Sequence, residues 1–219
     1  MVRQARSEAT RRKIIDSAVE LFNEIGYAAA GLADIIERAE MTKGALYYHF
    51  DSKEALATAI IEEGSANLDS AFRSITESSA PALESIIHGA FVVADQLSAD
   101  KVARTGIRLI RAFGRFNEAA VRTYAGWLDE MTARVRQASE EGDLRADLDP
   151  AAVGGTIVGA MLGAELLSDA TSGDADLLRR LAMMWEILLP AIVSDESLSY
   201  FREFLARESL RHSRTVPGE

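Results

Sequence analysis

Residues 32–50 read LADIIERAEMTKGALYYHF, and their apolar positions follow a helical period on both sides of a short break. Thr42 stands just before the second half and is a favoured N-cap residue. The pattern predicts a helix over about residues 32–39, a tight turn, and a second helix that ends near residue 49. Two short helices joined in this way form a helix-turn-helix, whose second helix can enter the major groove of DNA.

The second of these helices carries hydrogen-bonding side chains where a buried helix would carry apolar ones. A glycine in its first turn lets the backbone approach a phosphate or a base closely. Lys43 can meet phosphate or guanine, and the Tyr47 hydroxyl can position the DNA backbone. The residues expected to contact DNA are Thr42, Lys43, Gly44, Tyr47, Tyr48 and His49. Structural alternatives exist for two of them, since Tyr48 can pack against the preceding helix and His49 can cap its own helix.

The segment before the motif predicts the third helix of a compact unit. Residues 7–25 carry an apolar stripe, and Gly26 follows where the end of a helix is expected. The stripe consists of Ile14, Ala18, Leu21, Phe22 and Ile25. The first residues are basic, and we expect Arg3 and Arg6 to reach phosphate or the minor groove as a flexible arm. The net charge of −10 does not oppose this, because residues 1–54 carry 8 basic and 9 acidic side chains and most of the acidity lies beyond them.

Beyond the motif the pattern stays helical and no alternating strand is found, so the predicted fold is all-α. Further helices are expected from residue 53 past 61 and over about 81–97, 100–113, 117–141, 150–171, 174–189 and 197–210. A proline at position 190 should kink or end the helix that contains it. We expect a helix-turn-helix domain over residues 1–52, joined through a shared helix to a larger helical domain over 53–210. Residues 211–219 are expected to form a disordered tail.

Composition excludes several classes of site. None of the 219 residues is cysteine, so disulfides and thiolate chemistry are absent. The three histidines, His49, His88 and His212, are scattered, so no histidine-based metal site is expected from one chain and no cofactor is predicted. Catalytic residues are not predicted either, because we find no paired carboxylates at helical spacing with histidines, no glycine-rich phosphate loop and no metal-ligand cluster. Without a signal-peptide core or a run of roughly 20 apolar residues, the protein is expected to be cytoplasmic and not in a membrane.

The motif closely resembles the TetR family of repressors. The matching residues are Gly26-Tyr27, Asp34-Ile35, Ala39, TKGALYYHF at 42–50, and Ser52-Lys53-Glu54. The resemblance implies a homodimeric repressor that binds a pseudo-palindromic double-stranded DNA operator and senses a small hydrophobic ligand with its larger helical domain. The chain departs from the family at Gly31, where threonine is frequent, and at Glu40, where glycine is usual. Glu40 is therefore expected to take a left-handed backbone conformation at some cost in energy.

The resemblance also implies a ligand pocket in the second domain. The candidates to line it are Phe91, Ile107, Ile110, Phe113, Trp127, Met131 and Met161, although each can instead be an ordinary core residue. The runs VARTGIRL at 102–109 and YAGWL at 124–128 resemble a subgroup, the γ-butyrolactone autoregulator receptors, in which the tryptophan that matches Trp127 lines the cavity. A γ-butyrolactone or butenolide is therefore the expected ligand. The alternatives are another hydrophobic metabolite or drug, or a regulator or architectural DNA-binding protein without ligand control.

The dimer is expected to form through the helices at 150–171 and 174–189, as the resemblance implies. Small residues recur there at a spacing of four, which makes a smooth face for a second helix. The predicted interface residues are Gly155, Gly159, Gly163, Leu181, Trp185 and Leu188. The alternative is that the smooth face packs inside one subunit.

Overall fold

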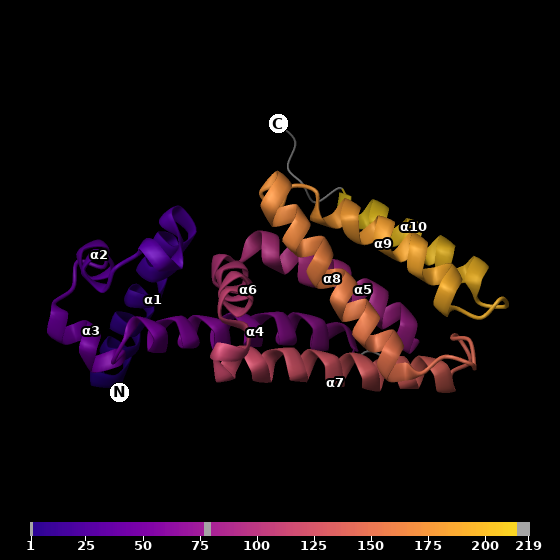
Figure 1. Ribbon diagram of the computed structural model, residues 1–219, viewed down its shortest axis with the longest axis horizontal. Helices are drawn as coiled ribbons and strands as arrows, with labels where there is room; N and C mark the ends of the chain where they lie inside the picture. Colours follow the sequence, from indigo (N-terminus) through magenta and orange to yellow (C-terminus); the bar gives the residue numbers. More distant parts are fainter. Residues whose placement is uncertain (1, 77–79, 214–219) are drawn as a thin grey trace. The chain divides into compact units, whose positions relative to one another are not determined.

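The computed structural model describes residues 2–76 and 80–213, and every regular element in those residues is helical (Figure 1). The elements are α1 (Val2–Ala29), α2 (Leu32–Arg38), α3 (Lys43–His49), α4 (Lys53–Thr76), α5 (Ala82–Ala99), α6 (Lys101–Phe113), the 3-10 turn η1 (Gly114–Phe116), α7 (Glu118–Glu140), α8 (Pro150–Ser172), α9 (Leu177–Ile192) and α10 (Leu198–Ser213). The predicted all-α fold is confirmed. Residues 211–213 belong to α10 instead of a tail, and residues 214–219 of the predicted tail lie outside the described residues.

Local signals explain most helix ends. Gly26 has φ +82° and breaks α1, as its position after the apolar stripe predicts. The Asp149 carboxylate accepts a hydrogen bond of 3.0 Å from the backbone N–H of Ala152 and opens α8. Pro190 lies inside α9, which continues to Ile192, so the expectation that the helix ends at residue 189 is wrong by three residues. One missing N–H near a C-terminus removes a single hydrogen bond and does not stop the last turn.

The chain divides by packing into two compact units. The first contains residues up to 67 and residues 100–123, and the second contains residues 68–99 and those from 124 onward. The continuous helix α4 contributes to both units. The predicted domain boundary at residue 52 marks the end of the helix-turn-helix, whereas packing places the first part of α4 and all of α6 with it.

The core of the first unit contains the apolar stripe of α1. Ile14, Ala18 and Phe22 are almost fully buried with Ile35 of α2 and Leu46 of α3. These side chains come from three helices, which is why the unit needs all three to bury its apolar faces. Ile25, also predicted for the stripe, is 50% exposed and is corrected to a surface position, because it comes directly before the break at Gly26.

Helices α4 and α6 pack closely within the first unit through two glycines. A Cβ added to Gly64 would lie 2.8 Å from the carbonyl oxygen of Val102, and one added to Gly106 would lie 3.2 Å from that of Ile60. The helix backbones therefore touch where side chains would separate them. The Asn23 side chain of α1 adds hydrogen bonds to two residues of α6. These contacts make α6 part of the DNA-binding motif's own unit.

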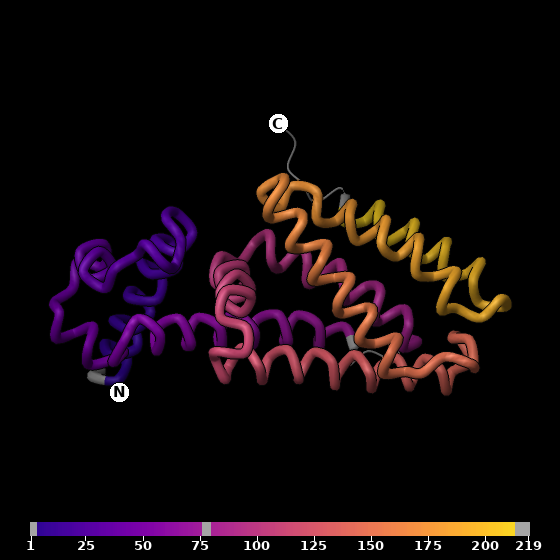
Figure 2. Tube along the Cα trace, in the orientation of Figure 1, coloured from indigo at the N-terminus to yellow at the C-terminus, as the bar shows by residue number. Residues whose placement is uncertain are grey.

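The second unit consists of the rest of α4 with α5 and α7–α10. Helix α9 packs against α8 on one side and α10 on the other, and it also contacts α5 (Figure 2). Trp185 of α9, Phe91 of α5 and Phe201 of α10 are at most 1% exposed and form the centre of this core. Gly154 of α8 allows a close approach to α7, because a Cβ there would lie 3.1 Å from the backbone nitrogen of Thr132.

Candidate functional site

Helix α3 is positioned by its caps and one buried residue. The Thr42 hydroxyl accepts a hydrogen bond of 3.2 Å from the backbone N–H of Ala45, which confirms the predicted N-cap. Leu46 is fully buried and Phe50 is 5% exposed, so these two side chains hold the inner face of the helix against the unit's core. The opposite face of α3 is left for solvent.

The predicted DNA-contacting residues gather on this outer surface. Thr42, Lys43 and Gly44 are exposed, and Tyr47 and Tyr48 are 42% and 77% exposed. Tyr48 therefore does not pack against α1, and that alternative is wrong. The Lys43 ammonium lies 5.7 Å from the Tyr47 ring centroid, one helical turn away, so the two side chains share one side of α3.

His49 is half-buried beside this face. Its ring meets the Tyr48 ring edge-on, with centroids 4.9 Å apart, and lies 6.4 Å from the Phe50 ring. The backbone N–H that closes the helix is that of Phe50, which donates to the carbonyl of Leu46. His49 is thus held between two rings at the end of the candidate recognition surface.

The two departures from the family pattern lie on either side of α2, with Gly31 before it and Glu40 after it. Glu40 has φ +50°, which confirms the predicted left-handed conformation. Its carboxylate lies 3.2 Å from the ammonium of Lys13, so the acidic side chain is paired with a cation of α1. Gly31 begins α2, and its N–H donates to the Asp34 carboxylate at 2.9 Å. The Asp34 carboxylate thus accepts the N–H of Gly31, as in a capping box, whereas glycine has no side chain to accept an N–H from the first turn of α2.

We expect Glu40→Gly to raise the free energy of unfolding by about 0.5–1 kcal/mol. A side chain in the left-handed region costs roughly 1–2 kcal/mol, and glycine removes this cost. Part of the gain is offset, because glycine loses more backbone entropy on folding and cannot form the surface ion pair with Lys13. The matched control is Glu37→Gly in α2, which should lower stability by about 1 kcal/mol, because that position is helical. Urea unfolding measures both variants, and a loss in both would show that the conformation of residue 40 carries no cost.

The first residues of the described chain are helical, which corrects the expected flexible arm. Helix α1 begins at Val2, and the Thr10 hydroxyl donates to the carbonyl of Arg6 at 3.0 Å. This bond joins residues that are one helical turn apart. The Arg6 side chain is exposed, whereas the side chain of Arg3 lies outside the described residues. The basic group at Arg6 is therefore carried on a helix.

Two other arginines of α1, although partly exposed, pair with a carboxylate of α4. Arg12 forms a short ion pair with Glu63 of α4, and Arg11 lies 4.0 Å from the same carboxylate. The hydrogen bond to Glu63 raises the pKa of Arg12 above its ordinary value. These side chains help to fix α1 on α4.

Lys53 has a structural role that sequence reasoning missed. Its ammonium donates to the carbonyl oxygens of Tyr27 and Ala30, at 2.8 and 2.9 Å, and lies 4.3 Å from the Tyr27 ring centroid. It thereby holds the segment after the Gly26 break against the start of α4. The helix itself begins with a cap from Ser52, whose hydroxyl accepts a hydrogen bond of 3.0 Å from the N–H of Ala55.

The seven predicted ligand residues fall in both units. Ile107 and Ile110 are buried in the first unit, where Phe113 meets the Tyr27 ring edge-on. Phe91 and Met131 are buried in the second unit, and Met161 is half-buried there. Burial of this kind fits both core packing and the wall of an apolar pocket.

Trp127 is half-buried in the second unit and has a polar partner. Its indole N–H donates to the Asp69 carboxylate of α4 at 3.1 Å. The Tyr124 ring meets it edge-on, with centroids 5.8 Å apart. Since the N–H is occupied by Asp69, the ring face is the part of Trp127 that a ligand can contact without breaking a hydrogen bond.

The small-residue face of α8 is open within one chain. A Cβ added to Gly159 or Gly163 would meet no atom of the described residues within 4 Å, and one at Gly155 would come no closer than 4.0 Å, to Leu128. The alternative that this face packs inside one subunit is therefore not seen, because these three glycines make no close contact within the described part of the chain. The face remains available to a second helix.

Two predicted interface residues are corrected. Leu181 and Trp185 are 2% and 0% exposed within one chain, so they belong to the subunit's own core, while Leu188 is half-buried. Helical period cannot separate a core stripe from an interface stripe. Large apolar side chains that are exposed on the same two helices are Leu166, Leu167, Met183 and Ile187, with 47%, 52%, 49% and 74% exposure. Exposure of this extent along α8 and α9 is typical of an interaction surface.

The turn between α8 and α9 is tied by one carboxylate. Asp176 accepts hydrogen bonds from Arg180, Ser172 and Ser168, at 2.9, 2.7 and 2.8 Å, and these lower its pKa far below the ordinary value. Arg179 donates to its other carboxylate oxygen at 2.9 Å, and a charged acceptor with four donors holds the ends of both helices in one arrangement. The two helices that carry the exposed apolar residues are thus joined rigidly.

Helix α8 also passes the length and composition test for a membrane span. Its most apolar window has a mean hydropathy of 1.5, and 39% of that window is buried in the structure. One such helix is weak evidence, since core helices of soluble proteins pass the same test. Its glycine face and its exposed leucines are accounted for equally by a helix that packs on another protein surface.

Known proteins resemble the chain over nearly its whole length. Residues 14–60 match the family described as "Bacterial regulatory proteins, tetR family", and residues 80–194 match "Tetracyclin repressor-like, C-terminal domain". The A-factor receptor protein of Streptomyces griseus is 34% identical over 202 residues, which cover 92% of this chain and 70% of that protein.

Solved structures give the same picture. The crystal structure of a γ-butyrolactone receptor (ArpA-like protein) superposes with a TM-score of 0.79 at 30% identity, covering 94% of this chain and 99% of that one. CprB from Streptomyces coelicolor in complex with its biological operator sequence superposes with a TM-score of 0.76 at 30% identity, with the same coverage. The similarity thus extends through the second unit as well as the helix-turn-helix.

Proposed function

The chain belongs to the tetR family of bacterial regulatory proteins, and on that premise we propose that it is a dimeric repressor that leaves its operator when a γ-butyrolactone or butenolide binds. The observation that carries the ligand class is the extent of the likeness to receptors of this kind. A helix-turn-helix alone would say nothing about a ligand. Here the 34% identity to the A-factor receptor covers 92% of the chain, and therefore includes the helices outside the motif.

The DNA-binding part of the proposal rests on α3. Its outer face presents Lys43, Tyr47 and Tyr48 to solvent, and its first turn presents Thr42 and Gly44. In a dimer, two such helices lie about 34–36 Å apart, or a multiple of that distance, when each reads one half-site. A pseudo-palindromic operator matches this two-fold symmetry. We assign DNA contact to these residues together with Arg3, Arg6 and His49, in the cytoplasm where the DNA lies.

The proposed route from ligand to DNA is α4. This helix starts four residues after α3 ends and continues to Thr76. Its first part packs on α6 at Gly64, and its later part accepts the Trp127 hydrogen bond at Asp69. A ligand that changes the Trp127–Asp69 contact therefore acts directly on the helix that follows the recognition helix. An inducer must bind the DNA-free shape more tightly, since otherwise it shifts no equilibrium.

The experiment that tests the function is a DNA-mobility titration with the DNA that flanks this protein's gene. The protein should retain that DNA against an excess of random competitor and release it when a γ-butyrolactone or butenolide is added. Specific binding without release by any lactone would withdraw the ligand class and keep the DNA-binding regulator. Equal binding of random DNA would contradict the repressor itself.

We propose that α8 and α9 form the dimer, and we expect Gly159→Leu to weaken it. The leucine fits in one chain, because a Cβ there meets no described atom within 4 Å, but it would hold two α8 helices apart at a cost of about 1–3 kcal/mol. Analytical ultracentrifugation measures the dissociation constant. The matched control is Gly126→Leu, on an α7 surface that is equally open. Unchanged dimerisation of the Gly159 variant would remove this face of α8 from the interface.

A further inference from the structure

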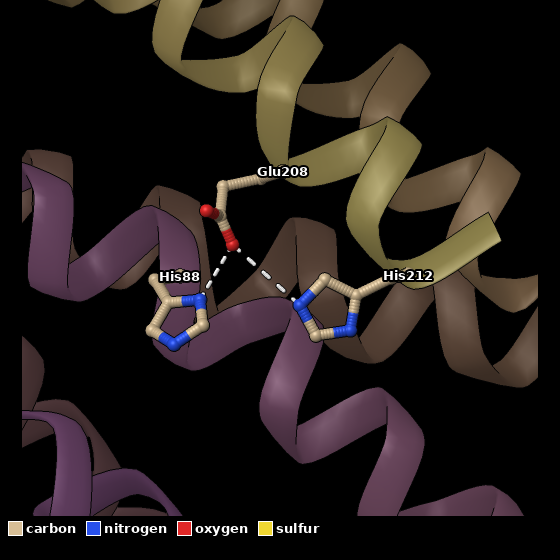
Figure 3. Close-up of side chains that lie close together, drawn as sticks. All are labelled: His88, Glu208 and His212. Atoms are coloured by element: carbon tan, nitrogen blue, oxygen red, sulfur yellow. Dashed lines mark hydrogen bonds and ion pairs between the residues drawn. The ribbon is translucent and has the colours of Figure 1, made fainter. Parts of the chain in front are cut away.

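Three ionisable side chains of the second unit meet between α5 and α10, although 120 residues separate the first, His88, from the second, Glu208. His88 belongs to α5, and Glu208 and His212 lie one turn apart on α10 (Figure 3). One ligand atom from each residue lies within 4.8 Å of the other two. The expectation that scattered histidines leave no metal-ligand cluster is therefore wrong, because the fold brings two of the three histidines together.

The cluster is formed around one oxygen of Glu208. The Nδ1 atom of His88 lies 2.5 Å from Oε2 of Glu208, and the Nε2 atom of His212 lies 3.5 Å from the same oxygen. The side chains of Glu208 and His212 are 3% and 8% exposed, and that of His88 is 23% exposed. The group thus has two nearly buried members and one side that reaches solvent.

Neighbouring side chains orient two of the three ligands, His212 and Glu208. The Nδ1 atom of His212 makes a short contact with the Asp95 carboxylate, which holds the imidazole ring in one orientation. In that orientation the Nε2 atom of the ring faces Glu208. Arg211 lies 2.9 Å from the other carboxylate oxygen of Glu208, Oε1, and leaves Oε2 to the two histidines. A carboxylate behind a histidine and a hydrogen bond to a ligating carboxylate are the usual outer contacts of a metal site.

We propose that His88, Glu208 and His212 bind a divalent transition-metal ion, with Zn²⁺ as the best match, and that Asp95 orients His212 for it. Two imidazoles and one carboxylate are a ligand set that zinc accepts, with water in the fourth position. Metal–ligand bonds of 2.0–2.1 Å at tetrahedral angles separate ligand atoms by about 3.3 Å. The His212–Glu208 separation of 3.5 Å already fits, and the His88–Glu208 pair must open by less than about 1 Å.

A bound ion would clamp the last turn of α10 to α5. The Phe91 ring stacks on His212, with centroids 5.4 Å apart, so the same clamp would fix a residue predicted to line the ligand pocket. The site is argued from its own geometry and stands independently of the lactone proposal. Its effect is on the stability and ordering of the second unit.

The test uses the full-length protein after treatment with a chelator, and zinc chloride alone as the probe. One zinc ion per chain should remain after gel filtration, measured by elemental analysis. Zinc at about 100 times its dissociation constant should raise Tm by roughly 5–10 °C. Cobalt(II) in place of zinc should give the visible absorption of a four-coordinate site. This measurement uses the unmodified protein and does not depend on any variant being folded.

Substitutions locate the ion. We expect His212→Gln and Glu208→Gln to abolish the stoichiometric zinc, and Asp95→Asn to weaken binding by about 10- to 100-fold. His49→Gln removes the histidine that lies outside the cluster and should retain the zinc, and far-UV circular dichroism confirms that each variant is folded. Loss of zinc only in the cluster variants supports the site. Zinc uptake that is absent from the unmodified protein, or equal in all variants, overturns it and leaves a hydrogen-bonded histidine–carboxylate cluster.

Discussion

Replacing Lys43 with alanine is expected to lower the affinity of the dimer for its operator by at least about 30-fold. A specific contact to a base edge contributes roughly 1–3 kcal/mol, and the dimer loses it in both half-sites, so the smallest expected loss is about 2 kcal/mol. The fold should not suffer. Lys43 is exposed, and its ring contact with Tyr47 is on the surface, so the change in stability should stay within about 0.5 kcal/mol.

The matched control for this variant is Lys101→Ala. Lys101 is also an exposed lysine at the start of a helix of the first unit, so its loss changes the net charge equally. It should leave specific affinity within a few fold. The dependence of binding on salt separates the roles further, since removal of a phosphate contact lowers the salt slope by about one per contact. If Lys43→Ala and Tyr47→Ala both bind the operator as the unmodified protein does, α3 is not the recognition helix.

The parts of the site that the sequence could predict are those set by neighbours in the chain. The Thr42 cap and the break at Gly26 each depend on a few adjacent residues and lie where those residue types favour them. The left-handed Glu40 follows instead from the family resemblance, because the family usually has glycine there and glutamate disfavours that conformation. The exposed face of α3 follows from the same local logic, because Leu46 and Phe50 take the buried side.

Packing between distant segments could not be predicted in the same way. The place of α6 in the first unit depends on the close contacts of Gly64 with Val102 and of Gly106 with Ile60. A single glycine in a helix does not indicate which distant residue it will contact. Trp185 was assigned to the dimer on an apolar period that a core helix shares, and its full burial shows the other use. The meeting of His88 with His212 likewise depends on how α10 returns to α5.

Helix α4 depends on both local and long-range contacts. It begins at a cap from the adjacent residue Ser52, whereas its contacts with α6 and with Trp127 join segments that are distant in the sequence. The helix is continuous over 24 residues, so Asp69 and Lys53 belong to the same element. The coupling proposed here requires only that the ligand alters the contact between Asp69 and Trp127.

We expect Trp127→Ala to bind the operator as the unmodified protein does and to fail to release it when a γ-butyrolactone or butenolide is added. The indole supplies a large apolar face, whose loss should weaken ligand binding by roughly 10- to 150-fold. Trp127→Phe separates binding from coupling. The smaller ring keeps an apolar face but has no N–H for Asp69, so the variant should retain most of its ligand affinity and lose the release.

Two titrations distinguish these outcomes for Trp127. Calorimetry gives the ligand affinity of each variant, and DNA mobility gives the ligand concentration that releases the operator. Allosteric coupling of about 1–3 kcal/mol changes operator affinity by roughly 5- to 150-fold, so its loss in Trp127→Phe is large enough to measure. Asp69→Asn should behave nearly as the unmodified protein, because the amide oxygen still accepts the indole N–H. Release of Trp127→Ala at the same ligand concentration as the unmodified protein would place the ligand away from Trp127, and release of Trp127→Phe would show that α4 is moved through another contact.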